Sequence, residues 1–333
     1  MIIKERNSSI DFLKFLAAIL ITNSHMGILY GKYGFMSTGG CIGDVLFFFC
    51  SGFTLFLKPM EGIKQFPNWY KRRISRIYPS IIAVAIIIYF FFNIHWDVMD
   101  ILIARKYWFL TCIMIYYIAI YFIGVYLKKW ITWIAVFVAI GSAIWLYFVY
   151  QLPKFTLYAN NYENGVNYVR WLLFFDFMLL CAFIGSVPKG KIICKPKKDL
   201  FLLVLSVLLF YIIFISTMKF KNVGYLQILS VLPLLSAVFY FYKVGLSPWA
   251  EKLYKNKVFY FIIRFVGGLC LEIYMIQYYL FTDKMNSIFP LNILIMFIIV
   301  ITAAYLTRCF ARLISQTFKD APYNWKKMIA LIE

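Results

Sequence analysis

The sequence predicts an all-α fold, a polytopic transmembrane bundle of about ten spans, from its composition and from the spacing of its apolar runs. Of the 333 residues, 63% are hydrophobic and 14% are charged, whereas soluble domains carry about 25% charged residues. One soluble core has no room for so much apolar surface, while the hydrocarbon of a bilayer accepts it. No repeat, linker or separable soluble segment interrupts the pattern, so we expect a single integral-membrane domain over residues 1–333.

The apolar runs have the length that membrane spans require, which is roughly 20 residues. Ten windows of this kind are present, the second and third of them short, at residues 10–30, 41–58, 78–95, 107–127, 130–150, 168–187, 199–218, 223–242, 265–283 and 290–308. The first window contains charged residues and lacks an A-x-A cleavage site, so we expect it to stay in the protein as the first helix.

The basic residues predict an orientation. If the N-terminus is cytoplasmic, 25 of the 34 Lys and Arg residues fall in cytoplasmic segments and 8 fall in segments on the other side. Because basic residues concentrate on the cytoplasmic side, both termini are expected there. The net charge of +20 lies in short clusters between apolar runs, which argues against a nucleic-acid partner. The longest outer loop, residues 151–167, is expected to be a plain connector.

The first window carries three ionisable side chains, which are costly within a membrane and are therefore candidates for function. Asp11 and Lys14 are three residues apart on one helix face, where they can pair. His25 follows Lys14 by eleven residues, which brings it back to the same face about 16 Å further along the axis. An imidazole titrates near neutral pH and suits a general base that acts on a hydroxyl. The alternative for His25 is a polar residue that bonds a neighbouring helix.

A basic cluster and a carboxylate complete the set of candidates. Arg72, Arg73 and Arg76 are close on a helix surface at the cytoplasmic end of the third window, and guanidinium groups match phosphate oxygens. Membrane anchoring alone explains such a cluster equally well. Glu272 lies inside the ninth window, where a carboxylate needs a partner or water. The seven cysteines lack CxxC spacing, so no metal site is predicted.

The first window, the basic cluster and the segment around Glu272, taken in their order along the chain, resemble the acyltransferase 3 family of bacterial membrane acyltransferases. The first helix of that family typically holds an Asp, a basic residue three positions later and a His eleven after that, as do Asp11, Lys14 and His25. The segment 43–57, the R-x-x-R-x-x-P run at 73–79 and the Trp-Phe-Leu helix from residue 107 look like later family motifs. Near the end of its sequences the family often has a motif whose last residue is a His. This chain has Gln277 at that position, and we assign it no proton-transfer role.

The resemblance implies acyl transfer, usually of acetyl, from cytoplasmic acyl-CoA to a hydroxyl of a surface or exported glycan. The expected location is the bacterial cytoplasmic membrane, as a multi-pass protein of the cell envelope. The expected partners are acyl-CoA, a glycan or lipid-linked saccharide acceptor, and the bilayer. Acetyl-CoA is then a donor substrate, and no permanently bound cofactor is expected.

On this interpretation the basic cluster and Lys14 meet CoA, Asp11 orients or neutralises Lys14, and His25 is a general base or carries the acyl group covalently. Glu272 is counted with the catalytic residues. The developing oxyanion needs donors, for which the candidates are Ser51, Asn23 and Tyr274. The alternative function is a transporter or flippase of a lipid-linked glycan, although no matching pair of broken helices is visible. A glycan polymerase or ligase would have a larger outer loop.

Overall fold

The computed structural model describes residues 7–55, 60, 62–151, 156–158, 161–162, 165–187, 192–318 and 321–332. The described residues are helical apart from turns, loops and one antiparallel hairpin of two-residue strands, β1 (Asn161–Tyr162) and β2 (Gly165–Val166). Parts of the predicted 151–167 loop, at 152–155, 159–160 and 163–164, lie outside the described residues.

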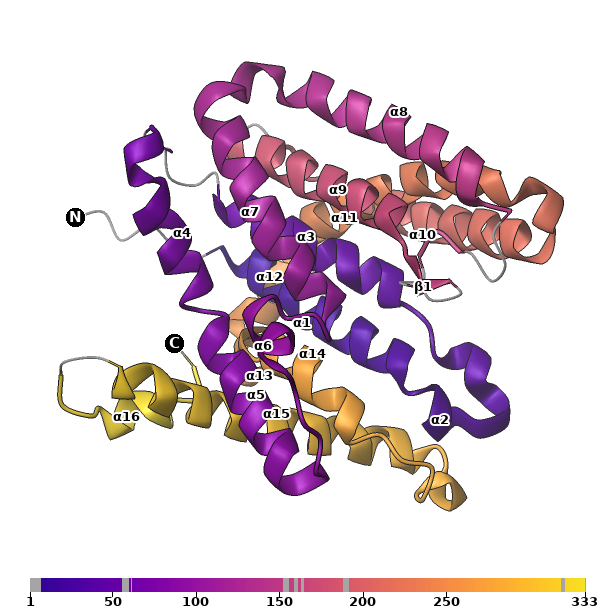
Figure 1. Cartoon of the computed structure of the whole chain (residues 1–333). Helices are drawn as coiled ribbons and strands as arrows, with labels where there is room; N and C mark the ends of the chain where they lie inside the picture. The colour runs from indigo at the N-terminus through magenta and orange to yellow at the C-terminus, as the bar shows by residue number, and fades with distance from the viewer. Residues whose placement is uncertain are drawn as a thin grey trace. The chain divides into compact units, whose positions relative to one another are not determined.

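The helices follow the apolar windows along the chain (Figure 1). The α-helices are α1 (Ser8–His25), α2 (Gly27–Tyr30), α3 (Gly40–Leu55), α4 (Phe66–Ile74), α5 (Tyr78–Phe92), α6 (Val98–Leu102), α7 (Trp108–Tyr126), α8 (Ile131–Val149), α9 (Tyr168–Ser186), α10 (Pro196–Lys219), α11 (Val231–Gly245), α12 (Pro248–Lys255), α13 (Lys257–Gly268), α14 (Cys270–Ile276), α15 (Leu291–Thr317) and α16 (Trp325–Met328). Short 3₁₀ helices link them, at η1 (Gly31–Met36), η2 (Ile63–Gln65), η3 (Lys128–Trp130), η5 (Lys221–Ser230), η6 (Gln277–Tyr279) and η7 (Asn286–Ile288).

The described residues contain six helical segments that are long and apolar enough to cross a membrane. They are Ile63–Phe92, Trp108–Tyr126, Lys128–Val149, Pro196–Lys219, Asn222–Gly245 and Leu291–Thr317. Two bent helix pairs raise the number to eight if each pair is one span. The windows 41–58 and 168–187 coincide with α3, which is shorter, and with α9. The all-helical membrane fold is therefore confirmed, while the count of about ten and the orientation stay predictions.

Two windows expected as plain spans are broken helices. Ser8–His25 and Gly27–Met36 meet at 63°, and Lys257–Gly268 and Cys270–Tyr279 meet at 54°. Glycines flank both breaks, and glycine weakens a helix and is common at kinks. The two helices of each pair are apolar enough for a span when they are taken together, so an apolar window does not register the break. Irregular backbone at membrane depth is tolerated where protein buries it or where it lines a cavity.

The chain divides into two compact units, which are described separately. The first unit holds Met1–Leu13, Val45–Lys64 and Tyr116–Lys255. Within it, α8 packs against α9 and α10 packs against α11. Lys243 of α11 donates to Asp199 of α10 at 2.6 Å, and the other oxygen of Asp199 accepts the N–H of Lys195 at 2.7 Å. This buried ion pair joins α10 and α11 near the N-terminus of α10.

The second unit holds Lys14–Asp44, Gln65–Ile115 and Asn256–Glu333. Its frame is formed by α5, α14 and α15, because α15 packs against both α5 and α14 and α14 packs against α5. The same unit contains α2 and η1, which follow α1, and η6 and η7, which follow α14. Most of the predicted site residues belong to this unit.

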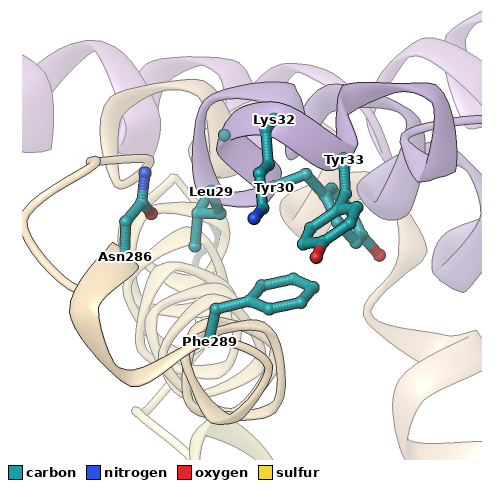
Figure 2. Close-up of a pocket in the computed structure, with 7 residues that line it drawn as sticks. Leu29, Tyr30, Lys32, Tyr33, Asn286 and Phe289 are labelled. Carbon is teal, nitrogen blue, oxygen red and sulfur yellow. The ribbon is translucent and has the colours of Figure 1, made fainter.

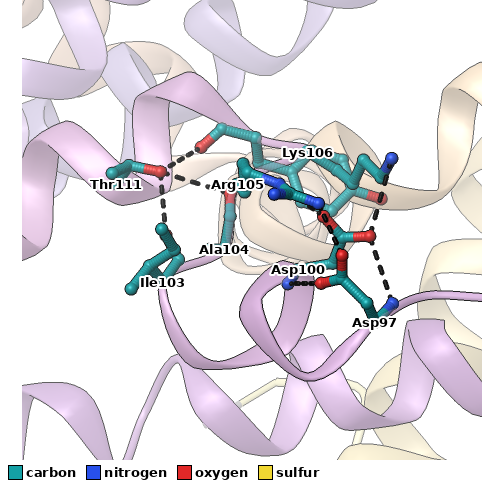
Figure 3. A network of polar contacts seen from close by, with 8 residues as sticks. Asp97, Asp100, Ile103, Ala104, Arg105, Lys106 and Thr111 are labelled. Carbon is teal, nitrogen blue, oxygen red and sulfur yellow. Dashed lines mark hydrogen bonds and ion pairs between the residues drawn. The ribbon is translucent and has the colours of Figure 1, made fainter.

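The loop between α5 and α7 is held by a network of charges and helps to fix α14 (Figure 3). Asp97 and Asp100 form a capping box at the start of α6, and Arg105 donates to both carboxylates, at 2.6 and 2.9 Å. The backbone N–H of Asp100, together with Arg105, lowers the pKa of Asp97 below its usual 3.8. Directly after this network, the hydroxyl of Tyr107 donates to the carbonyl of Met275 in α14 at 2.7 Å.

Candidate functional site

The central feature of the second unit is a hydrogen bond between His25 and Tyr278. His25 is the last residue of α1, at the first helix break, and Tyr278 lies in η6, at the end of the second broken helix. The imidazole Nε2 and the Tyr278 hydroxyl are 2.7 Å apart, and the two ring centroids are 4.6 Å apart. The predicted functional histidine, which is exposed, therefore meets a residue 253 positions away in the chain, as the alternative of a polar residue bonding a neighbouring helix also predicts.

Aromatic rings surround this pair on the α14 side. The ring of Tyr274 lies one turn before Tyr278, with 6.3 Å between their centroids. Tyr274 also contacts the rings of Tyr107 and Phe109 of the preceding loop and α7, at 5.6 and 5.7 Å. These contacts fix the direction in which the end of α14 presents Tyr278.

Two buried polar side chains that are close to this pair in the chain have no hydrogen-bond partner among the described residues. Gln277, directly before Tyr278, is fully buried, and neither its Nε2 nor its Oε1 is bonded. Thr22, one turn before His25 on α1, is 1% exposed and its Oγ1 is also unpaired. An unmade hydrogen bond of a buried group costs about 1–3 kcal/mol. Such groups mark places where a ligand or water supplies the missing partner.

Glu272 is buried and both of its carboxylate oxygens are bonded. Ser80 of α5 donates to Oε1 at 2.8 Å, and Arg308 of α15 donates to Oε2 at 3.1 Å. Arg308 also donates to the carbonyl of Gly268, at the break before α14. This ion pair and its two further bonds tie α14 to α5 and α15. The partner expected for a carboxylate at this position is thus Arg308.

Lys14 and Asp11 occupy different units. Lys14 lies on α1 eleven residues before His25, half-buried, and acts electrostatically on the thiol of Cys270, as do Glu272 and Arg308. Asp11 is buried in the first unit, where burial and, to a smaller extent, this carboxylate raise the pKa of Tyr254. The Asp11–Lys14 pairing expected from the sequence stays a prediction.

The basic cluster lies at the end of α4 and in the turn that follows it. Arg73 stacks on the ring of Trp69, with its guanidinium 5.3 Å from the centroid. Arg72 and Arg76 are exposed, and neither forms an ion pair within the described part of the chain. Two guanidinium groups are therefore available for an anion.

Of the three predicted oxyanion donors, Asn23 already uses its amide. Its Nδ2 donates to the carbonyls of Met36 and Thr38, at 2.9 and 3.0 Å, and its Oδ1 accepts from Tyr30 at 2.6 Å. This side chain closes the turn after the first helix break. Tyr274 lies close to the His25–Tyr278 pair, as described above, while Ser51 belongs to the first unit.

Sequence reasoning missed one further candidate, Asp176 in α9 of the first unit. It is 6% exposed, and neither carboxylate oxygen has a hydrogen-bond partner among the described residues. The rule that selected Glu272, a carboxylate inside an apolar window, selects Asp176 as well. Over the described ranges, no group of three or more His, Cys, Asp and Glu side chains is arranged to hold a metal ion.

Comparison with known proteins identifies the family. A sequence model of the acyltransferase 3 family, described as an acyltransferase domain, matches residues 7–309, nearly the whole chain. No curated protein and no solved structure matches the chain. The family match and the apolar helices together make this a multi-pass membrane protein, and the chain belongs to the acyltransferase 3 family.

Proposed function

We propose that this protein transfers an acyl group, most simply acetyl, from cytoplasmic acyl-CoA to a hydroxyl of a surface or exported glycan, in the bacterial cytoplasmic membrane. Membership of an acyltransferase family supports the reaction type. The observation that carries the choice of site is the 2.7 Å contact between His25 Nε2 and the Tyr278 hydroxyl. A phenol hydroxyl lies against the imidazole there, and we assign the acceptor hydroxyl to the same place.

The proposed reaction is direct transfer with His25 as general base. The acceptor hydroxyl gives its proton to His25 as its oxygen attacks the thioester carbonyl. The C–S bond then breaks, and the departing CoA thiolate takes the proton back from His25, so that an ester and free CoA result. Proton transfer by a positioned side chain typically contributes 10²–10⁴-fold. Tyr278 is a positioning residue, because its hydroxyl orients the imidazole until the acceptor replaces it.

The amide of Gln277 suits the oxyanion of this reaction. Its Nε2 is a buried donor without a partner among the described residues, next to the residue that bonds His25. Donors that are fixed before the reaction stabilise charge more effectively than water does, because they need not reorganise. We therefore assign the role of oxyanion donor to Gln277 and not to Asn23, whose amide is already bonded. Gln277 has no part in proton transfer.

The donor's charged end is assigned to the basic cluster. The phosphates of CoA match the exposed guanidinium groups of Arg72 and Arg76, and Lys14 offers a further cation on the His25 helix. Glu272 acts in this scheme by fixing α14 through Ser80 and Arg308, and so by positioning Tyr278, rather than by exchanging protons.

Mass spectrometry of surface glycans tests the proposal, on cells with the gene, without it, and with His25→Ala. The wild-type glycan should carry an acetyl group that is missing from the other two. His95→Ala is the matched control, because this other histidine, in the loop after α5, packs edge-on against the ring of Tyr89 and its loss should leave acetylation intact. Identical glycans in all strains would contradict acyl transfer. Loss of the whole glycan from the surface of the deletion strain would instead favour a transporter.

A further inference from the structure

A pocket of about 340 Å³ opens beside the first helix break in the second unit (Figure 2). One wall comes from α2 and η1, with Tyr30, Lys32 and Tyr33, and the opposite wall comes from η7 and the residue after it, with Asn286 and Phe289. The volume lies within the range of about 300–1,000 Å³ that is typical of small-molecule sites.

Hydrogen bonds between the two walls hold the pocket in shape. Asn286 donates to the carbonyl of Ile28 at 2.9 Å, and Asn292 donates to the carbonyl of Leu29 at 2.8 Å. Gly31 turns the chain at the pocket with a φ of +51°, which side-chain-bearing residues rarely adopt. The walls are therefore held by asparagine side chains that donate to backbone carbonyls, and the side chains of Lys32, Tyr33 and Phe289 are left for a ligand.

Those side chains combine an aromatic surface with a positive charge. The rings of Tyr33 and Phe289 stack with 5.3 Å between their centroids and 22° between their planes. The ammonium of Lys32 lies 5.1 Å from the Tyr33 centroid. Within the described residues Lys32 is exposed and forms no ion pair. The C–H face of a pyranose ring packs on aromatic rings, and an ammonium group attracts a carboxylate or phosphate.

The position of the pocket fits the proposed acceptor. Both walls belong to segments that the charge pattern assigns to the outer side, and α2 starts two residues after His25. The pocket lining begins at Leu29, four residues after His25 in the chain and just past the helix break. A sugar held in the pocket can thus present a hydroxyl of its neighbour to His25.

We propose that this pocket binds the acceptor through an anionic sugar, a pyranose that carries a carboxylate or a phosphate. The inference rests on the proposed acyl transfer to a glycan and names the part of the acceptor that the protein recognises. Tyr33 and Phe289 hold the ring, and Lys32 selects for negative charge.

Saturation-transfer NMR on the purified full chain in detergent tests the pocket directly. The probes are methyl β-D-glucuronide, glucose 6-phosphate, the neutral methyl β-D-glucoside, and glycerol 3-phosphate as an anion without a ring. One of the two anionic sugars should bind roughly five-fold more tightly than the glucoside, as expected for one exposed charge pair. Lys32→Ala should abolish this preference. Tyr33→Ala should weaken binding of every sugar.

Lys284→Ala is the matched control, because it removes the same charge from an exposed position on the neighbouring outer segment and should change nothing. No sugar binding by the wild-type protein, or an undiminished preference in Lys32→Ala, would overturn the proposal. Binding of glycerol 3-phosphate as tight as that of the sugars would also overturn it and would indicate a lipid headgroup instead.

The same preparations separate this inference from the proposed function. His25→Ala should bind the anionic sugar as the wild-type protein does while it transfers no acetyl group. Transfer to a glycan without sugar binding in the pocket would refute the pocket alone. Sugar binding without any transfer by the wild-type protein would refute the proposed function alone.

Discussion

Replacing Gln277 by Met should make the protein more stable and less active at the same time. The amide is fully buried, and neither of its polar atoms is bonded within the described residues. Because each buried unpaired group costs about 1–3 kcal/mol, an apolar side chain of similar length removes that cost. The loss of one oxyanion donor, by contrast, lowers kcat by about 10²–10³-fold. Opposite signs for stability and rate are expected of a site that is built for a ligand.

The assay pairs thermal unfolding in detergent with acetyl transfer by the same preparation. We expect the Tm to rise by a few °C, at roughly 2–4 °C per kcal/mol for chains of 150–250 residues. Gln227→Met is the matched control. Gln227 is also buried, but its Oε1 accepts the N–H of Leu157 at 2.8 Å, so this substitution should lower the Tm. A lower Tm in Gln277→Met would show that its amide is bonded, and an unchanged kcat would remove the oxyanion role.

Three more predictions follow from charges in the second unit. Glu272→Gln should destabilise the protein by about 3–5 kcal/mol, because it leaves Arg308 without its buried partner. Adding Arg308→Met should restore much of the stability and activity. If the double variant is stable but still inactive, Glu272 is catalytic. Replacing Arg72 and Arg76 by Ala should raise the KM for acetyl-CoA about ten-fold with little change in kcat, and an unchanged KM would reduce the basic cluster to membrane anchoring. The lowered pKa of Asp97 means that its contribution to loop stability is complete above pH 3.8 and disappears as the pH falls through the lowered value. Hydrogen exchange of the loop amides should show this loss in the wild-type protein and a smaller loss in Asp97→Asn, which keeps the Asp100 carboxylate.

The apolar windows predicted the positions of the helices well but not their internal breaks. The windows 107–127 and 130–150 coincide with α7 and α8 almost to the residue, because uniformly apolar runs have few other conformations available in a bilayer. The break after His25 depends on contacts made by Asn23 with residues more than ten positions away, which no local average contains. The last span continues to Thr317, beyond the predicted end at 308, because its helix carries Arg308 inward to Glu272.

The site residues that could be predicted are those whose own segment makes them unusual, as an ionisable residue is within an apolar window. His25 and Glu272 are ionisable residues in apolar windows, so the cost of placing them in a membrane pointed to both, although the fold buries Glu272 and leaves His25 exposed. Their partners, Tyr278 and Arg308, are a common interfacial residue and a common flanking cation, and only the folded chain shows which of many such residues is used. Gln277 is recognisable only from its missing hydrogen bonds, which have no counterpart in the sequence.

The most direct test of the account is acetyl transfer by the purified full chain in detergent, from isotopically labelled acetyl-CoA to glycan extracted from deletion-strain cells. The wild-type protein should label the glycan, and His25→Ala should not, at equal amounts of folded protein. Tyr278→Phe should retain activity to within about two- to ten-fold of the wild type, because the acceptor replaces this hydroxyl and the free protein loses one neutral hydrogen bond of about 0.5–1.5 kcal/mol. Labelling by His25→Ala at the wild-type rate would contradict the central claim that this histidine takes the proton of the acceptor.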